Sequence, residues 1–367
     1  MLKIKYPKNR ENFESDYINS LNISTEAQDK FKAFLNEPIF KECNITSLDE
    51  LLVFPFEKLL EIYNLYMKKY PFPKGKNKRE KDEKLKIEIK YEDFFAYQIT
   101  YQRKIANFFM KYSEVLQLKT CYFCNIEYIN TFDNRGEYSD FIDFINNATM
   151  EELIQIYNIV EKDAKSIIQK REKKPIVSID ELNLTSKKKE NLKNLKFKIN
   201  QESHFTLDHF LPKANCPILA LSLYNFVPSC YSCNSKFKQS EVLLKSHLSP
   251  TSKDFSVNYE VKFKLFFAEN RRDFNLIMKH PKNKGYEDYI KIFKLKGRYT
   301  FHKGEVRELL IKKRKYPQSR IDEMAKAIKI PRGQIRKDIF GKELFENDSG
   351  GSMSKLKRDI AKDMGIL

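Results

Sequence analysis

Four of the six cysteines in the chain form two Cys-x-x-Cys pairs. Within each pair, the spacing brings two thiolates to one side of a tight turn, where both can ligate one zinc ion at about 2.3 Å. Two such pairs complete a tetrahedral shell. The sequence therefore predicts a structural zinc site with four ligands, Cys121, Cys124, Cys230 and Cys233.

Two other interpretations fit a Cys-x-x-Cys pair, namely a redox centre and two unrelated buried thiols. The pairs lie much further apart than in a compact zinc ribbon, so their spacing alone excludes neither. The polar residues between them favour zinc. Cys43 and Cys216 are left over, and Cys216 is expected to be a small packing residue.

Polar residues of catalytic type lie between and beside the cysteine pairs. The segment FTLDHFLPK contains Asp208 and His209, and the segment NFVPSCYSCNSK begins with Asn225 and contains Asn234 directly after the second pair. Together with the first pair, these motifs resemble those of the zinc-stabilised HNH endonucleases, which belong to the His-Me finger group.

The resemblance covers residues 121–124 and 206–238 by motif and the rest of the chain only loosely. It implies a β-hairpin followed by a helix that grips a catalytic metal, with zinc at the base of the helix. The fold class that follows is α+β. A ββα-metal core would lie inside a predominantly helical chain, with a small antiparallel β region after the core.

Phosphodiester hydrolysis accounts for the residue types that the resemblance brings together. The reaction needs a base for the attacking water, a cation for the developing charge and stabilisation of the leaving oxygen. His209 would be the general base, because an imidazole with an ordinary pKa of about 6.5 is mostly neutral at cellular pH. Asp208 and the amide oxygen of Asn234 would hold Mg²⁺ or Mn²⁺, which suit such hard ligands. Asn225 would pin the loop that orients the base.

The residues around Asn234 depart from the family pattern in two ways. The last letter of the motif is often histidine, although asparagine also occurs there, and the basic residue usual one place after Lys236 is replaced by Phe237. The asparagine should alter metal preference more than abolish activity. Three lysines are expected to contact nucleic acid, Lys213, Lys236 and Lys238.

The elements that must position these residues belong to a long, basic chain. Its 367 residues suffice for two or three domains, and Lys+Arg 68 against Asp+Glu 50 gives a net charge of +18. We expect a polyanionic partner, nucleic acid before a membrane surface, although a Lys-rich composition can also serve solubility alone. No apolar run approaches the roughly 20 residues that span a bilayer, so a cytoplasmic protein without a membrane partner is expected.

Hydrophobic periodicity and chain breakers divide the sequence into six regions. Four are expected to be mainly helical: 1–90, ending in a basic linker from Lys68 to Lys90; 91–130, with one long helix over 92–116 and the first cysteine pair; 131–200, an insertion; and 303–367. The nuclease core occupies 201–245. Region 246–302 is expected to be rich in β-structure, with strands over 255–265, 274–278 and 292–301.

The insertion resembles a tandem helix-hairpin-helix module of the competence-protein type. Hairpins of that kind use glycine-rich turns whose backbone N–H groups meet a DNA phosphate. Here glycine is missing from both turns, Tyr157–Glu161 and Leu184–Lys187. Since the backbone then approaches a phosphate less closely, duplex binding and a protein-contact or spacer role both stay open.

The tail contains two expected short helices, 319–329 and 331–337, that could form a helix-turn-helix unit, although most such pairs only pack together. The tail as a whole resembles that of HNH proteins from bacterial anti-phage loci of the Septu type. Those proteins often work beside an ATPase, so the resemblance implies a partner of this kind.

These features predict a metal-dependent endonuclease that acts on nucleic acid, with DNA favoured, in anti-phage defence. Zinc would be structural, and Mg²⁺ or Mn²⁺ would be catalytic. Two alternatives stay open. One is a zinc-stabilised module that binds nucleic acid or protein through an inactive HNH core, and the other is an RNase or toxin that uses the same core.

Overall fold

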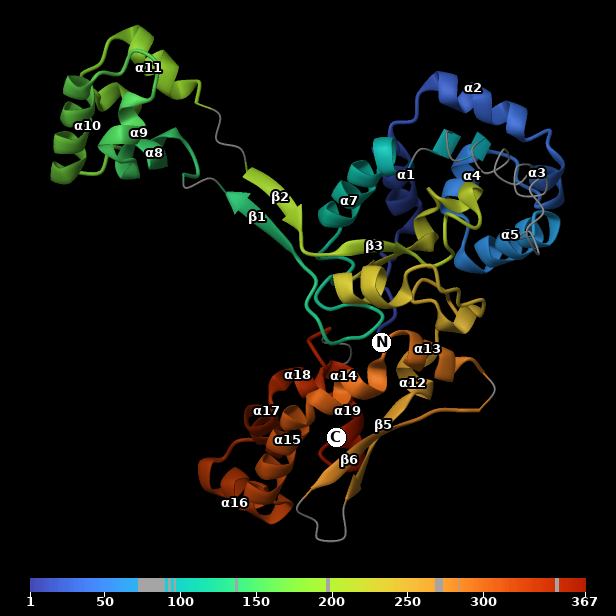
Figure 1. Ribbon diagram of the computed structural model, residues 1–367. Coiled ribbons are helices and arrows are strands. Elements are labelled where there is room, and N and C mark those ends of the chain that lie inside the picture. Colours follow the sequence, from blue (N-terminus) through green and yellow to red (C-terminus); the bar gives the residue numbers. More distant parts are fainter. Residues whose placement is uncertain are drawn as a thin grey trace. The chain divides into compact units, whose positions relative to one another are not determined.

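The computed structural model describes residues 1–71, 90–91, 94–95, 97–135, 138–195, 199–267, 273–282, 284–346 and 350–367. Within them the fold is α+β, with many helices and three two-stranded sheets (Figure 1). The chain divides into two compact units, here called the main unit (Met1–Asn130 with Ser203–Leu367) and the insertion (Thr131–Glu202). The insertion expected at 131–200 lies wholly within the second unit.

Short helices with polar caps open the main unit. Ser24 Oγ accepts a hydrogen bond from Ala27 N (3.2 Å) and Ser47 Oγ accepts one from Glu50 N (3.1 Å), so each serine satisfies a donor that a helix start leaves free. The expected basic linker lies for the most part outside the described residues. The helices are α1 (Arg10–Leu21), α2 (Thr25–Phe34), α3 (Pro38–Glu42), α4 (Leu48–Val53) and α5 (Phe56–Lys69).

A further helix of the main unit begins with a π-helical turn, η1 (Tyr97–Tyr101), and continues as α7 (Gln102–Lys111). It was expected to reach Leu116 but ends at Lys111. The chain then turns through Gln117, which has a φ of +55°. This turn buries both Leu116 and Leu118, which a continuous helix would place on different faces.

The insertion has its own hydrophobic core, centred on buried residues such as Ile145, Leu153 and Ile167. Thr149 opens one of its helices with a capping box, in which Glu152 reaches back to the Thr149 N–H (2.7 Å). Strands β1 and β2 pair with each other. The elements are β1 (Thr131–Arg135), α8 (Phe141–Asn147), α9 (Met150–Ile154), α10 (Glu161–Lys173), η2 (Ile179–Glu181), α11 (Ser186–Lys193) and β2 (Ile199–Ser203).

An antiparallel hairpin and a helix follow the insertion in the order expected for region 201–245. Strand β3 (Thr206–His209) pairs with β4 (Phe226–Ser229), and a π-helical segment, η5 (Ser232–Lys238), comes directly after. The connection between the strands is long and contains two short 3-10 helices, η3 (Pro217–Leu219) and η4 (Leu223–Asn225).

Region 246–302 contains one hairpin and more helix than expected. Strands β5 (Lys262–Phe267) and β6 (Phe274–Lys279) pair antiparallel, so the strand expected over 274–278 is confirmed. The strand expected over 255–265 is wrong in its first half, where α12 (Val257–Glu260) forms. The apolar residues Val257 and Val261 are four apart, a spacing that fits a helical turn as well as alternation.

The strand expected over 292–301 is also wrong, because α14 (Leu295–Phe301) lies there. Leu295 and Tyr299 are again four apart, and both are buried. A helix brings such a pair to one face and into the core. The other elements of the region are η6 (Ser246–Leu248) and α13 (Tyr286–Ile292).

The tail is helical, as expected, and its helices share a small apolar cluster that includes Leu309, Ile321 and Ile335. The two helices expected over 319–329 and 331–337 are present and meet at Lys329, which has a φ of +54°. The helices are α15 (Lys303–Lys315), α16 (Gln318–Ile328), α17 (Arg332–Phe340), α18 (Lys342–Phe345) and α19 (Ser354–Asp363).

Candidate metal centre and catalytic pocket

The two cysteine pairs meet in the main unit as one buried cluster. The four sulfur atoms lie within 4.8 Å of one another, and Cys124 Sγ and Cys230 Sγ are 4.0 Å apart. Zinc bonds of about 2.3 Å in a tetrahedron give sulfur–sulfur edges of about 3.8 Å, so little adjustment is needed to close the shell. The cysteines could therefore bind a metal such as zinc.

Backbone hydrogen bonds hold each pair in a tight turn. In the first pair, Cys121 N donates to Glu127 O (2.9 Å), and Asn125 N donates to Cys121 O (2.7 Å). Asn125 has a φ of +54°, a conformation that asparagine tolerates better than most residues. In the second pair, Asn234 N donates to Cys230 O (3.1 Å) at the start of η5. Local sequence thus shapes both halves of the cluster.

Arg298 of α14 completes the surroundings of the cysteines and was not predicted. Its Nη1 lies 3.2 Å from Cys233 Sγ, and its Nη2 lies 3.3 Å from Cys124 Sγ and 2.7 Å from Glu127 Oε1. A guanidinium beside buried thiolates compensates their negative charge. Nothing in the sequence near the cysteines signals this residue, since it lies 174 positions beyond Cys124.

His209 ends β3 and lines a pocket of about 520 Å³ in the main unit. Its ring lies against those of Tyr97 and Phe226, with centroids 4.6 and 4.8 Å away. Nε2 is 2.9 Å from the carbonyl oxygen of Ala220; because a carbonyl only accepts, Nε2 carries the proton and Nδ1 keeps a lone pair. Burial, more than nearby lysine charge, lowers the His209 pKa to about 3. The ring is therefore neutral at neutral pH, but it is a weaker base than the ordinary imidazole expected from the sequence.

Asn225 holds the loop that contains Ala220, the hydrogen-bond partner of His209. Its Oδ1 accepts a hydrogen bond from Leu211 N (2.8 Å), and its Nδ2 donates to Leu211 O (3.0 Å) and Leu219 O (3.2 Å). The side chain is fully buried. It therefore fixes both ends of the segment before Ala220, which is the loop contact expected for Asn225.

Asp208 is buried next to His209 and forms an ion pair that was not predicted. Lys238 Nζ donates to Asp208 Oδ1 (3.2 Å) and to His209 O (2.9 Å), and it lies 3.1 Å from Asp208 Oδ2. Burial raises the pKa of Asp208 to about 6, although Lys238 opposes this shift. Lys238 is wholly buried. Its expected contact with nucleic acid is therefore wrong, because solvent and substrate do not reach it.

Of the other expected site residues, two line this pocket and one does not. Asn234 and Lys213 line it together with Asp208 and His209. Lys213 Nζ is 5.6 Å from the ring centre of Tyr97. Lys236 is exposed and does not line this pocket. Its Nζ lies over the ring of its neighbour Phe237. Tyr97 is a lining residue that the sequence did not single out.

The first of the two glycine-free turns of the insertion contains a residue in a left-handed conformation. Asn158 in the first turn has a φ of +66°, so it takes the left-handed conformation that glycine would supply. Tyr157 O in the same turn accepts a hydrogen bond from Asn191 Nδ2 of α11 (2.8 Å). This hydrogen bond fixes the first turn against α11.

No protein-family model, curated protein or solved structure matches the chain. Among the described residues, no helix combines the length and the apolar character needed to cross a bilayer.

Proposed function

We propose that the pocket at the end of β3 hydrolyses phosphodiester bonds of nucleic acid, DNA above all, as an HNH endonuclease does. The observation that carries the proposal is the setting of His209: Nε2 is tied to Ala220 O at 2.9 Å, and the ring lines one pocket with Asp208 and Asn234. The likeness of the tail to proteins of anti-phage loci extends the proposal to defence beside an ATPase.

The donors in the pocket suit a hard divalent cation. Asp208 Oδ2 is buried and accepts no hydrogen bond from any described residue, and Lys238 Nζ lies 3.1 Å from it, so a metal ion would share this oxygen with the lysine or displace the lysine. The amide oxygen of Asn234 is a neutral ligand of the kind that Mg²⁺ and Mn²⁺ accept. When bound, the ion would neutralise charge that develops on the phosphate.

The residues of the chain then have separate tasks. His209 accepts the proton of the attacking water at Nδ1, because Nε2 already carries a proton. Asn225 and the Ala220 carbonyl keep the ring in its orientation. Lys213, which lines the same pocket, supplies positive charge for a substrate phosphate.

The ion pair of Lys238 with Asp208 favours a second function. An ammonium 3.1 Å from Asp208 Oδ2 already compensates the carboxylate, and a core that no longer holds a catalytic cation would need such compensation. The protein would then be a zinc-stabilised module that binds nucleic acid or protein without cutting. An RNase or toxin would be a variant of the first function, with the same pocket.

Cleavage by the purified full-length protein tests the two functions against each other. Supercoiled plasmid, single-stranded DNA and RNA are incubated with Mg²⁺, with Mn²⁺ or without added metal. We expect metal-dependent cleavage that His209→Ala slows by about 10²–10⁴-fold, because this change removes the base and no structural ligand. Substrate binding and zinc content should stay as in the wild type.

His302→Ala is the matched control, since His302 is a half-buried histidine of the main unit that does not line the pocket. Its cleavage rate should equal that of the wild type. Equal single-turnover rates for His209→Ala and the wild type would show that the site is wrongly assigned. Nucleic-acid binding without cleavage under any metal condition would support the binding module.

A further inference from the structure

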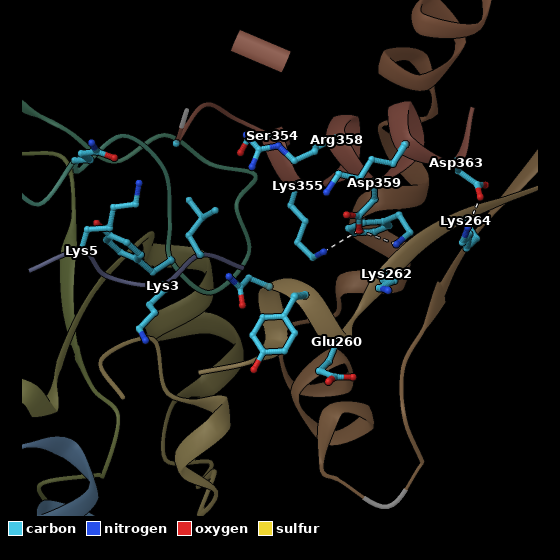
Figure 2. Close-up of a pocket in the computed structure, with 18 of the residues that line it drawn as sticks. Lys3, Lys5, Glu260, Lys262, Lys264, Ser354, Lys355, Arg358, Asp359 and Asp363 are labelled. Carbon is cyan, nitrogen blue, oxygen red and sulfur yellow. Dashed lines mark hydrogen bonds and ion pairs between the residues drawn. The ribbon is translucent and has the colours of Figure 1, made fainter. Parts of the chain in front are cut away.

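A pocket of about 840 Å³ opens between the N-terminal segment, β5 and α19 of the main unit (Figure 2). None of the residues of the proposed catalytic pocket lines it. Pockets of about 300–1,000 Å³ are of the size that encloses a small-molecule ligand. This pocket is therefore a separate candidate site.

The walls of the pocket carry an excess of positive charge. Seven lysine and arginine side chains line it, against three aspartates and glutamates. Figure 2 shows Lys3 and Lys5 on one side, and Lys262, Lys355 and Arg358 on the other. Cations gathered in a concave surface attract an anion more strongly than the same cations spread over a convex one.

Two of the acidic side chains are already used in ion pairs within the walls. Lys355 Nζ lies 2.8 Å from Asp359 Oδ2, which also accepts a hydrogen bond from Phe263 N of β5 (3.0 Å). Lys264 pairs with Asp363 in the same way. These contacts fix α19 against β5 and leave little negative charge in the walls to balance Lys262 and Lys362.

Lys262 and Lys362 both lie near the buried Lys355. Both are exposed, and both lie close enough to Lys355 for their charges to add to the burial that lowers the Lys355 pKa. Asp359 opposes this shift but is a single carboxylate beside three ammonium groups. A bound anion would relieve the repulsion among them.

Asn258 provides a hydrogen-bond acceptor that a ligand could use. Asn258 lines the pocket, and its Oδ1 is buried and has no hydrogen-bond donor among the described residues. An unsatisfied buried acceptor costs about 1–3 kcal/mol, which a ligand N–H or O–H would recover. An ionised phosphate has no such donor, so a ligand that meets both needs carries phosphates and a hydroxyl or amino group.

We propose that this pocket binds a nucleoside polyphosphate. Its phosphates would lie against Lys262 and Lys362, and a sugar hydroxyl or base amino group would donate to Asn258 Oδ1. A nucleotide fits the volume of the pocket, whereas a nucleic-acid duplex would lie across its mouth. The inference is independent of the proposed nuclease activity.

Titration calorimetry with the full-length protein tests this site. ATP, GTP, inorganic tripolyphosphate and adenosine are titrated at low salt without added divalent metal. We expect ATP or GTP to bind, tripolyphosphate to bind more weakly, and adenosine to give no detectable binding. The double variant Lys262→Ala/Lys362→Ala should weaken nucleotide binding at least tenfold. Asn258→Leu should weaken the nucleotide and leave tripolyphosphate unchanged.

The control is Lys291→Ala/Lys326→Ala, which removes the same charge from exposed positions outside the pocket. It should bind nucleotides as the wild type does. An equal loss in both double variants would mean that only net charge matters, and absence of nucleotide binding to the wild type would overturn the proposal. Binding of a duplex oligonucleotide alone, weakened by Lys262→Ala/Lys362→Ala, would assign the surface to nucleic acid instead.

Discussion

The cysteine cluster and the pocket of His209 lie in the same unit but are built in opposite ways. The cluster has four identical side chains that converge within 4.8 Å and leave no open position. The pocket combines a carboxylate, an imidazole and an amide, and it opens to a volume of about 520 Å³. The four cysteines of the cluster can together bind one metal ion. In the pocket, the charge of the Asp208 carboxylate is compensated by Lys238 of η5.

This difference shows which kind of site is easier to recognise from a sequence. One cysteine pair in a turn has several uses, but two pairs that flank polar residues of catalytic type favour a zinc site. Oxygen donors have many uses, and their role depends on what is packed around them. Each prediction below removes a residue of the cysteine cluster or of the His209 pocket and compares the effects on the two sites.

Loss of one cysteine should have the largest effect. Binding of structural zinc is linked to folding by about 10 kcal/mol or more in small zinc domains, which is comparable to the whole stability of a domain. Cys230→Ser should therefore lose zinc and unfold the main unit, as measured by elemental analysis and circular dichroism. The insertion has its own core and should survive as a protease-resistant fragment.

Cys43→Ala provides the comparison, because Cys43 is a buried thiol outside the cluster. It should retain one zinc per chain and a folded main unit. If Cys230→Ser also keeps a full zinc complement and its fold, the cluster is not the structural site that its geometry suggests.

Removal of the buried lysine should have the next largest effect. Lys238→Met leaves the Asp208 carboxylate buried without its cation, a change that costs about 3–5 kcal/mol. Burial raises the pKa of Asp208 to about 6 even with Lys238 present, and without it the pKa should rise further. A raised pKa means that the folded state holds the proton more tightly than the unfolded chain does. Stability is therefore lost as pH rises from the ordinary Asp pKa of about 4 up to the pKa in the folded protein, and this range extends further in Lys238→Met.

Urea unfolding at two pH values measures this effect. The stability lost in Lys238→Met should be larger near pH 8 than near pH 6, because each pKa unit corresponds to about 1.4 kcal/mol. Lys236→Met, an exposed neighbour, should change the free energy of unfolding by at most about 0.5 kcal/mol at either pH. A loss in Lys238→Met that does not vary with pH would mean that packing, rather than charge, makes Lys238 important.

Loss of the loop asparagine should have the smallest effect of the three. Asn225→Ala removes three hydrogen bonds and leaves buried backbone groups unsatisfied, at a cost of about 1–3 kcal/mol. Cleavage should fall about tenfold, because Ala220 no longer holds His209 in place. Asn215→Ala, in the same connection but bonded to Tyr63, should retain the wild-type rate. Equal rates for the two variants would remove Asn225 from the positioning of the base.

The sequence predicted the parts of the site that depend on local spacing. The cysteine pairs, the strand that ends at His209 and the loop contact of Asn225 all involve residues close together in the chain. The contacts of Lys238 and Arg298 come from packing between distant segments. Lys238 had been expected at the surface, since nothing in its neighbourhood shows that it reaches back to Asp208.

The fold errors have a similar cause. Val257 and Val261, like Leu295 and Tyr299, are spaced so that alternation and helical periodicity coincide. Periodicity over so few residues does not separate a strand from a helix. The hairpin of β5 and β6 was predicted only in part: the strand expected over 274–278 matches β6, whereas the strand expected over 255–265 overlaps β5 only at its end.

The distance between the two halves of the cysteine cluster has a consequence for the order of events during synthesis. Cys124 and Cys230 are 106 positions apart, so at about 5–20 residues per second a ribosome needs roughly 5–20 s to make the second after the first. The insertion is completed within that interval and can fold before any zinc is enclosed. Until then, the first pair of thiols waits in a nascent chain, where oxidation or capture of a different metal competes with correct assembly.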